Sequence, residues 1–569
     1  MLYGFSGHTD EKLSMSMAMA LAHRCGAPTA HASTYGTLGW GRLEESPGGA
    51  GIAVDGERVA ALAGFLTGRA SGRTVHHILD AHHRRGVDAL GELEGVFVLA
   101  LMDRDRVHLV RDRAGARTLY YGVHGGRLRF ACEPKGVLAD SSFPRRLRPG
   151  AVAQYLTYSF VPGAGTMLED LHELLPGHRL EWHSGTVRVV PLPPERIELP
   201  GRSGNWPAVL SSTIGDAVED RRPAGQPVGA FLSGGIDSSI VVAELAARHD
   251  APVRTYSIHF GPPHLNELPF AAAVAERCRT DHTEVLIRPR GFAPRLRQAI
   301  WHLDDPIGDP ITVPNFELAR RVSGDVSHVF NGEGGDPLFG GPKNLPMLLH
   351  HWYGGPGHGP GHRERAYLES YRRGYSELEQ LLTPEILAGV DTERDLEGPL
   401  QPFLSGPGEP SMLHRLLRAN TKLKGAHLIL PKVDRMMAAH GLVPLSPLFD
   451  ERLIALSLAM PPECKLRAGV EKVVLKEAYR GRLPREVVDR PKSGMRVPVR
   501  AWFRRELRRY ARSVLSSKAL AAAGIFRPER VAQWLRYDTE EHESRYGLWL
   551  WMLLTFELWR RIVLEGEAA

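Results

Sequence analysis

The chain has 569 residues and a formal net charge of +6, and 43% of its residues are hydrophobic and 24% are charged. This length allows two or three domains, each with a sizeable core, and the composition is ordinary for a globular protein. No apolar run reaches the roughly 20 residues that a membrane-spanning helix needs, and the N-terminal segment MLYGFSGHTD lacks the pattern of a secretory signal. The four cysteines show neither a disulfide framework nor CxxC spacing, so we expect a cytoplasmic protein without a membrane partner.

The first part of the chain has the pattern of an antiparallel β domain. Short apolar runs separated by glycine turns occupy residues 96–103, 107–112, 118–123 and 128–132, and they predict strands. The segment PLPPERIELPGRSG (191–204) is rich in proline, glycine and charge, which is typical of a linker. We therefore predict a first, α+β domain over residues 1–195.

After the linker the pattern changes to strands that alternate with helices. The apolar run VGAFL (228–232) leads into SGGIDSS and a helical stretch, and further strand-like runs lie at 254–260, 283–287 and 327–332. This alternation predicts an α/β domain over residues 206–569, in which a parallel sheet is covered on both faces. We place the sheet core at 226–345 and a mostly helical part at 346–569.

The loop SGGIDSS is the strongest chemical signal in the sequence. Gly234 and Gly235 let main-chain N–H groups approach an anion closely, and the helix that follows adds the positive end of its dipole. Asp237 fits a phosphate site if it holds Mg²⁺. No GK[ST] follows, so the loop is not a Walker motif. A loop that cradles pyrophosphate suits attack at the α-phosphate, so we expect ATP to be cleaved to AMP and pyrophosphate. The loop hydroxyls belong to Ser233, Ser238 and Ser239.

The loop resembles that of the PP-loop ATP pyrophosphatases, and the rest of the chain resembles the asparagine synthetase family. The stretches ELEGVFVLALMDRDRVHLVRDRAGARTLYYG and LRFACEPKGVL are similar to the core of that family's glutaminase domain, an Ntn-hydrolase-like antiparallel sandwich. GEGGDPLFGG (332–341), KVDRMMAAHGL, PLFD, GVEKVVLKEA and RPKSGMRVPV follow in family order. The resemblance covers nearly the whole chain.

This resemblance implies a site for ATP and Mg²⁺. Asp237 and Asp336 would hold Mg²⁺ between the phosphates. The adenosine site would be lined, largely through backbone groups, by Leu232, Ile258 and Gly332.

The resemblance also implies two catalytic residues. Glu333 matches an acidic residue that accepts a proton from the attacking amine. Lys472 matches a lysine that reaches the α-phosphate and the developing oxyanion. Arg490 and Lys492 are weaker candidates on the phosphate side.

One departure from the family concerns the glutaminase nucleophile. Glutamine-dependent members carry a cysteine as residue 2, whereas this sequence has Leu2, and Cys25 lies too late to replace it. The segments that hold glutamine are also unrecognisable, since residues 63–68 are AGFLTG. We therefore expect residues 1–195 to form an inactive amidotransferase-like domain, and the amine not to derive from glutamine.

A second departure concerns the acid. Asparagine synthetases carry a Glu and an Arg at positions that match Val443 and Leu445, which favours an acid that is larger or less polar than aspartate. The segment LDDPIGDP contains three aspartates that either line an acceptor channel or cap helices. They are Asp304, Asp305 and Asp309.

The leading functional hypothesis is an ATP-dependent amide synthetase that uses an amine of its own substrate. Relatives with an inactive glutaminase domain include β-lactam synthetases and the macrolactam cyclases of lasso peptides. The match at Glu333 favours the broader asparagine-synthetase-like and peptide-cyclase groups over the β-lactam type, and within these groups family analogy favours macrolactam formation. The expected substrate is a small-molecule or peptide carboxylate, and a precursor-peptide, leader-binding or peptidase partner is expected with it. The alternative is an asparagine synthetase fed with ammonia.

Two other classes fit less well. A PP-loop enzyme that thiolates tRNA would need a CxxC context or an RNA-stacking module, and neither is present, so we expect no nucleic-acid partner. A non-catalytic scaffold is disfavoured because the motif residues Asp237, Glu333, Asp336 and Lys472 are intact.

Overall fold

The computed structural model describes most of the chain. The residues not described are 27, 42–48, 194–203, 224, 265, 342, 354–358, 372–373, 410, 492–496 and 541–546. Most of the predicted linker and Lys492 therefore lie outside the described residues. Within the described part, no helix combines the length and the hydropathy needed to cross a membrane.

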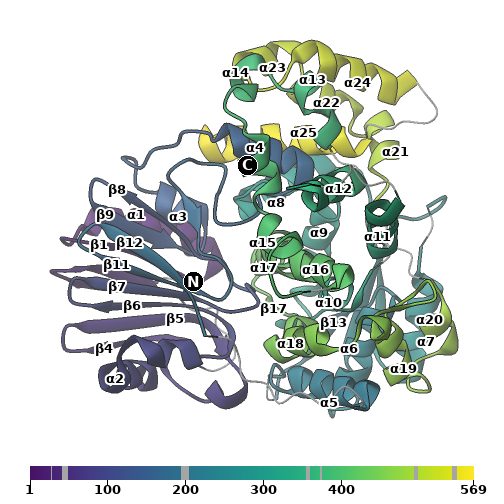
Figure 1. Cartoon of the computed structure of the whole chain (residues 1–569), viewed down its shortest axis with the longest axis horizontal. Helices are drawn as coiled ribbons and strands as arrows, with labels where there is room; N and C mark the ends of the chain where they lie inside the picture. Colours follow the sequence, from purple (N-terminus) through teal and green to yellow (C-terminus); the bar gives the residue numbers. More distant parts are fainter. Residues whose placement is uncertain are drawn as a thin grey trace.

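The N-terminal part is a sandwich of two antiparallel sheets (Figure 1). The first sheet has the order β10 (His172–Glu173), β8 (Tyr120–His124), β9 (Arg127–Ala131), β1 (Leu2–Ser6), β3 (Gly36–Trp40) and β2 (Thr29–Ser33). The second has the order β12 (Thr186–Pro191), β11 (His178–His183), β7 (Arg106–Arg111), β6 (Gly95–Asp103), β5 (Arg58–Leu66) and β4 (Gly51–Asp55). The four strands predicted from apolar runs are thus β6, β7, β8 and β9.

Helices cover the outer faces of this sandwich, so its central strands are buried on both sides. Along β6, Val98 packs into the core between the sheets, whereas its neighbour Leu99 packs against α2 (Val75–Arg85). The other sheet is covered by α1 (Glu11–Leu21) and α3 (Pro134–Leu138). Burial on both faces explains why these strands have continuous apolar runs instead of alternating polar and apolar residues.

The C-terminal part contains a five-stranded sheet in which all neighbouring strands are parallel, as predicted. Its order is β15 (Asp281–Leu286), β14 (Arg254–His259), β13 (Val228–Phe231), β16 (His328–Phe330) and β17 (Val443–Leu445). One face is covered by α5 (Trp206–Glu219), α6 (Ile236–Ala246), α7 (Leu268–Cys278), α18 (Glu451–Ala459) and α19 (Val473–Tyr479). The other face is covered by α8 (Phe292–Leu303), α9 (Thr312–Val322) and α17 (Leu430–Ala438).

The remaining described elements are mostly short helices. They are α10 (Gly335–Phe339), α11 (Asn344–Tyr353), α12 (His362–Tyr371), α13 (Leu378–Leu381), α14 (Pro384–Leu387), α15 (Gln401–Leu404), α16 (Met412–Ala419), α20 (Arg485–Asp489), α21 (Val499–Arg504), α22 (Arg508–Val514), α23 (Ser517–Ala523), α24 (Pro528–Glu540) and α25 (Gly547–Trp559). A two-stranded hairpin, β18 (Leu466–Arg467) and β19 (Val470–Glu471), precedes α19.

Two elements cross the boundaries predicted from the sequence. The fifth strand, β17, comes from within 346–569 and extends the sheet beyond the predicted core at 226–345. Helix α4 (Pro149–Tyr158) lies within 1–195 but packs beside α25 (Figure 1). The Tyr155 hydroxyl on α4 donates to the carbonyl of Met552 at 3.0 Å. The first part of the chain thus contributes to the core of the second.

Buried ion pairs join the two parts. Glu173 accepts a hydrogen bond from Arg111 at 2.6 Å and lies 3.0 Å from the ring nitrogen of His427. Asp434, on α17, pairs with Arg117 of the sandwich. Burial alone would raise the pKa of Glu173, but the charges of His427 and Arg111 lower it to about 2. The interface is therefore held in part by a carboxylate, Glu173, that stays ionised well below neutral pH.

Candidate active site

A cavity of about 210 Å³ lies at the carboxyl ends of the parallel strands. The loops after β13 and β16 and the end of β14 border it, and this edge is where open α/β sheets bind ligands. Eight of the predicted site residues line it: Leu232, Ser233, Gly235, Asp237, Ser238, Ile258, Gly332 and Glu333. Sequence positions up to 101 residues apart, from Leu232 to Glu333, thus meet in one place.

The loop between β13 and α6 is folded tightly. Gly234 has φ +74°, and a Cβ there would lie 2.7 Å from the backbone nitrogen of Ala271, so only glycine fits without strain. The N–H of Ser233 donates to the Ser238 hydroxyl at 3.1 Å, and the N–H of Gly235 donates to the Ser233 hydroxyl at 3.3 Å. Gly235 then caps α6, so the first N–H groups of that helix open toward the cavity edge.

Ser239 differs from the prediction. Its side chain is fully buried, and its hydroxyl donates to the carbonyl of Gly235 at 2.8 Å. It does not line the cavity. The last serine of the motif therefore stabilises the first turn of α6 and does not present its hydroxyl to a ligand.

The loop after β16 approaches the nucleotide loop very closely. A Cβ on Gly332 would lie 2.4 Å from the backbone nitrogen of Ser238, and a Cβ on Gly335 would lie 2.1 Å from the Asp237 carboxylate. A side chain at Gly332 would force the two backbones apart, and a side chain at Gly335 would displace the Asp237 carboxylate. The glycines of GEGGD thus serve to bring Asp237 and the Glu333 loop together.

Asp237 and Asp336 converge on Lys472. The ammonium of Lys472 lies 2.5 Å from Asp237 Oδ2 and also pairs with Asp336. Lys472 is fully buried and caps α19 with φ +56°, a conformation that is unusual outside glycine and is often kept at functional positions. The structure therefore brings together the three charged residues whose roles were inferred from the family resemblance.

The two carboxylates suit a Mg²⁺ ion that is shared with phosphate. Hard oxygen donors and few protein ligands are typical of Mg²⁺ bound to nucleotides. Among the described residues, no group of three or more His, Cys, Asp or Glu side chains has a geometry that could hold a metal. Asp237 and Asp336 would therefore hold the ion only together with ligand oxygens.

Glu333 lies in a network that the motif comparison did not reveal. Its backbone N–H donates to Asn331 at 3.1 Å, and this amide oxygen also accepts from the Ser446 hydroxyl at 2.9 Å. Lys432, on α17, donates to Asp309 at 2.7 Å. Burial would lower the pKa of Lys432, but the charges of Asp309 and Glu333 raise it overall, so this lysine is held charged beside the candidate base.

The cavity wall contributed by α9 and α17 was also missed. It includes the apolar side chains of Leu318, Val433, Met436 and Met437, together with Ile311, which immediately precedes α9. These residues carry no chemical signature and lie on helices remote in sequence from the loop. The quoted motif KVDRMMAAHGL did contain three of them, but nothing in it indicated which side of the helix would face the cavity.

The acidic group of LDDPIGDP is divided by the structure. Asp304 accepts from the backbone N–H of Lys135 at 2.6 Å, and Asp305 accepts from the Tyr120 hydroxyl at 2.6 Å, so both lie at the interface with the sandwich. Asp309 alone is near the cavity, through Lys432. Neither proposed interpretation, an acceptor channel or helix capping, describes all three.

Val443 and Leu445 do not contact the cavity. They lie in β17, each only 1% exposed, and pack into the sheet core. Our inference that these two positions line the acceptor pocket is therefore wrong, because the alternation of the strand directs both side chains into the face covered by α5 and α18. They do not select the acid by direct contact.

Position 2, where glutamine-dependent members have their nucleophilic cysteine, is packed inside the sandwich. Leu2 is fully buried, and its N–H donates to the Cys132 sulfur at 3.1 Å. The Met1 ammonium donates to the carbonyl of Gly41 at 2.6 Å, and burial lowers its pKa. The cavity beside Met1 measures about 30 Å³, which is room for a water molecule or two and not for an amino-acid substrate.

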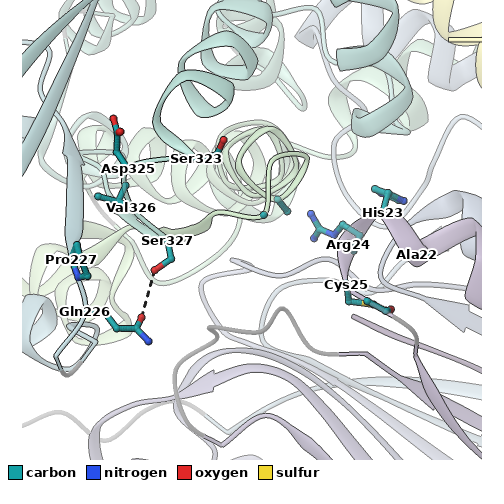
Figure 2. Close-up of a pocket in the computed structure, with 14 residues that line it drawn as sticks. Ala22, His23, Arg24, Cys25, Gln226, Pro227, Ser323, Asp325, Val326 and Ser327 are labelled. Carbon is teal, nitrogen blue, oxygen red and sulfur yellow. Dashed lines mark hydrogen bonds between the residues drawn. The ribbon is translucent and has the colours of Figure 1, made fainter.

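A larger cavity, of about 610 Å³, lies between the two parts of the molecule (Figure 2). His23 and Arg24 line it from the sandwich, and Gln226 and Ser327 line it from the other side. Gln226 precedes β13 and Ser327 precedes β16, so this cavity lies at the amino ends of the strands, opposite the nucleotide loop. None of the predicted site residues lines it.

Comparison with known proteins agrees with these observations. A family model described as asparagine synthase matches residues 210–561, and one described as a glutamine amidotransferase domain matches residues 71–191. The glutamine-hydrolysing asparagine synthetase 1 of Bacillus subtilis (strain 168) is 25% identical over 525 residues, which are 84% of this chain and 79% of that protein. A putative glutamine-hydrolysing asparagine synthetase of Mycobacterium tuberculosis (strain H37Rv) is 28% identical over 555 residues, 91% of this chain and 81% of that protein.

The first family model alone covers more than half of the chain, and the residues it spans include the cavity, the loop and Lys472. The chain therefore belongs to the asparagine synthase family and is a carbon–nitrogen ligase that uses ATP.

Proposed function

We propose that this protein adenylates a carboxylate with ATP and joins the acyl group to an amine of its own substrate. The loop from Ser233 to Ser239 would bind the phosphates, and Leu232, Ile258 and Gly332 would surround the adenosine. Mg²⁺ held by Asp237 and Asp336 would neutralise charge on the phosphates.

In this proposal two side chains act on the reacting groups. Lys472 would stabilise the charge that develops as the acid attacks the α-phosphate and as the amine attacks the acyl carbon. Glu333 would accept a proton from the amine, and the neighbouring charge of Lys432 favours the ionised carboxylate that this step needs.

The observation that carries the second half of the proposal is the environment of Leu2. A side chain that is fully buried in the sandwich core stands where glutamine-dependent members have their nucleophile. Among the described residues, the small cavity beside Met1 and the bonded Met1 ammonium leave too little room for glutamine at this end of the chain. The N-terminal domain would then be structural, and the amine would not be ammonia released from glutamine.

We favour an intramolecular reaction that closes a macrolactam on a peptide. The apolar side chains of Ile311, Leu318 and Met436 support an acid less polar than aspartate. A precursor peptide with a leader-binding or peptidase partner would fit such a reaction. The second candidate is an asparagine synthetase that uses free ammonia. The names of the relatives support the asparagine synthetase part of this candidate, although those proteins are named as glutamine-hydrolysing.

Pyrophosphate release tests the proposal. The protein is incubated with ATP, Mg²⁺ and panels of amino acids, small acids and linear peptides, and glutamine, ammonium or no added amine is supplied in parallel. The proposal expects release with a peptide or a large acid and no dependence on glutamine. Aspartate- and ammonium-dependent formation of AMP would establish the alternative instead, and stimulation by glutamine would contradict the assignment of the N-terminal domain.

A further inference from the structure

Arg490 follows the short helix α20 and contacts the outer side of the nucleotide loop. Its guanidinium donates to the carbonyl of Gly234 at 3.0 Å and to the Glu267 carboxylate at 2.6 Å. It also lies over the ring of Phe270, with its central carbon 4.0 Å from the ring centroid. Only 14% of its side chain is exposed, so these three contacts hold it in one place.

The contact with Gly234 fixes a peptide plane. The Gly234 carbonyl and the Gly235 N–H belong to the same peptide unit, which is planar and trans, so the two groups point in opposite directions. Because Arg490 holds the carbonyl on the outer side, the Gly235 N–H is turned inward, where it lies 3.3 Å from the Ser233 hydroxyl. Gly235 and Ser233 both line the cavity.

Two contacts orient this plane, the Arg490 bond to its carbonyl and the bond from its N–H to Ser233, and only the first comes from outside the loop motif. Gly234 has φ +74° and no side chain, so its flanking peptides rotate more easily than those of other residues. Glu267 and Phe270 lie at the start of α7. Gly234 packs so closely against them that a Cβ on this glycine would clash with both residues. Arg490 thus joins the end of α20, the start of α7 and the loop.

We propose that Arg490 is a positioning residue that holds the Gly234–Gly235 peptide so that the Gly235 N–H faces the phosphates of ATP. This differs from a direct phosphate ligand, the role considered for Arg490 from the sequence. The Glu267 carboxylate pairs with the guanidinium and compensates its charge on the side away from the cavity. The inference rests on the proposed role of the loop in ATP binding.

Titration calorimetry with Mg²⁺·ATP and with adenosine tests the proposal without a known acid or amine. We expect Arg490→Met to bind ATP about 10-fold more weakly, which is the scale of one charge-assisted hydrogen bond. Its affinity for adenosine should not change, since adenosine makes no phosphate contact. Arg485→Met is the matched control, because Arg485 lies at the start of α20 and is 90% exposed, and this variant should bind both like the wild type.

Glu267→Gln separates the two roles of Arg490. If Arg490 positions the peptide, Glu267→Gln weakens the ion pair that holds Arg490 in place. ATP should then bind more weakly, as we expect for Arg490→Met. If Arg490 were a phosphate ligand, removing the competing carboxylate would leave ATP binding unchanged or tighter, and this result would overturn the proposal.

Arg490→Lys adds a second test, and it applies even where Arg490→Met does not fold. A lysine keeps the charge but not the planar fork, so we expect it to restore less than half of the lost affinity. Full restoration by lysine would also overturn the proposal. Failure of the wild type to bind ATP would contradict the role of the loop itself, and that outcome is distinguishable from the others.

Discussion

Replacing Lys472 with methionine tests the charged centre most directly. The side chain is fully buried and bridges two carboxylates, of which Asp237 is 9% exposed and Asp336 is 41% exposed. Removing one partner of a buried ion pair costs about 3 kcal/mol or more, whereas the exposed pair with Asp336 is screened by solvent and adds little. We therefore expect the free energy of unfolding of the C-terminal domain to fall by about 3 kcal/mol.

This loss corresponds to a measurable shift in Tm. Unfolding entropy is about 2.1 cal/mol/K per residue, so a domain of roughly 350 residues loses about 4 °C. With Mg²⁺·ATP the shift should shrink, because the metal supplies positive charge to the same carboxylates. Pyrophosphate release should still fall at least ~100-fold, since the Lys472 ammonium no longer stabilises the developing oxyanion.

The assay compares thermal unfolding with and without Mg²⁺·ATP, and pyrophosphate release with an acid that the wild type accepts. Lys518→Met is the matched control, because Lys518 is exposed on α23 and should change neither quantity. A wild-type Tm for Lys472→Met without Mg²⁺ would refute its role as a counter-ion. Retained pyrophosphate release would refute its role in catalysis.

Three further changes test other parts of the molecule. Glu333→Gln should still release pyrophosphate but form at least ~100-fold less amide, and a parallel loss of both would show that this carboxylate is not the base for the amine. Leu2→Cys should yield no glutamate from glutamine, since the cavity beside Met1 measures only about 30 Å³, and glutaminase activity would contradict this reasoning. The Tm of the wild type should fall as the pH drops from about 5 to about 2. In this range the unfolded chain binds a proton at Glu173, whose unfolded pKa is 4.5, while the folded value is about 2. Glu173→Gln should flatten this part of the curve of Tm against pH, and an unchanged slope would show that other groups carry it.

Much of the fold could be predicted because its signals are local. Apolar runs such as 96–103 and 228–232 became strands β6 and β13, and the loop at Gly234 and Gly235 formed where its glycines indicated. Backbone preference and hydrophobic period act over a few residues, so they can be read without knowing the partner. The strand β17 has only three residues, which is too short for such a signal.

The candidate site was predictable only in part, for the same reason. Residues in motifs, such as Asp237 and Glu333, were identified, and the structure places them around one cavity. Lys432 and Asn331 were missed because their importance lies in their contacts with Asp309 and Glu333, which no spacing reveals. The interpretation of Val443 failed because the orientation of a side chain depends on which face of the strand is covered.

The sequence by itself determined the alternation of strands and helices, the glycine loop, and the absence of a cysteine at position 2. Each is a property of residue type and near neighbours. Only the tertiary structure decided that Asp237 and Asp336 share Lys472, that Leu2 fills a core, and that Glu267 takes up the charge of Arg490. These contacts join segments up to 235 residues apart, and their geometry follows from how the sheets and helices pack, which local sequence preference does not specify.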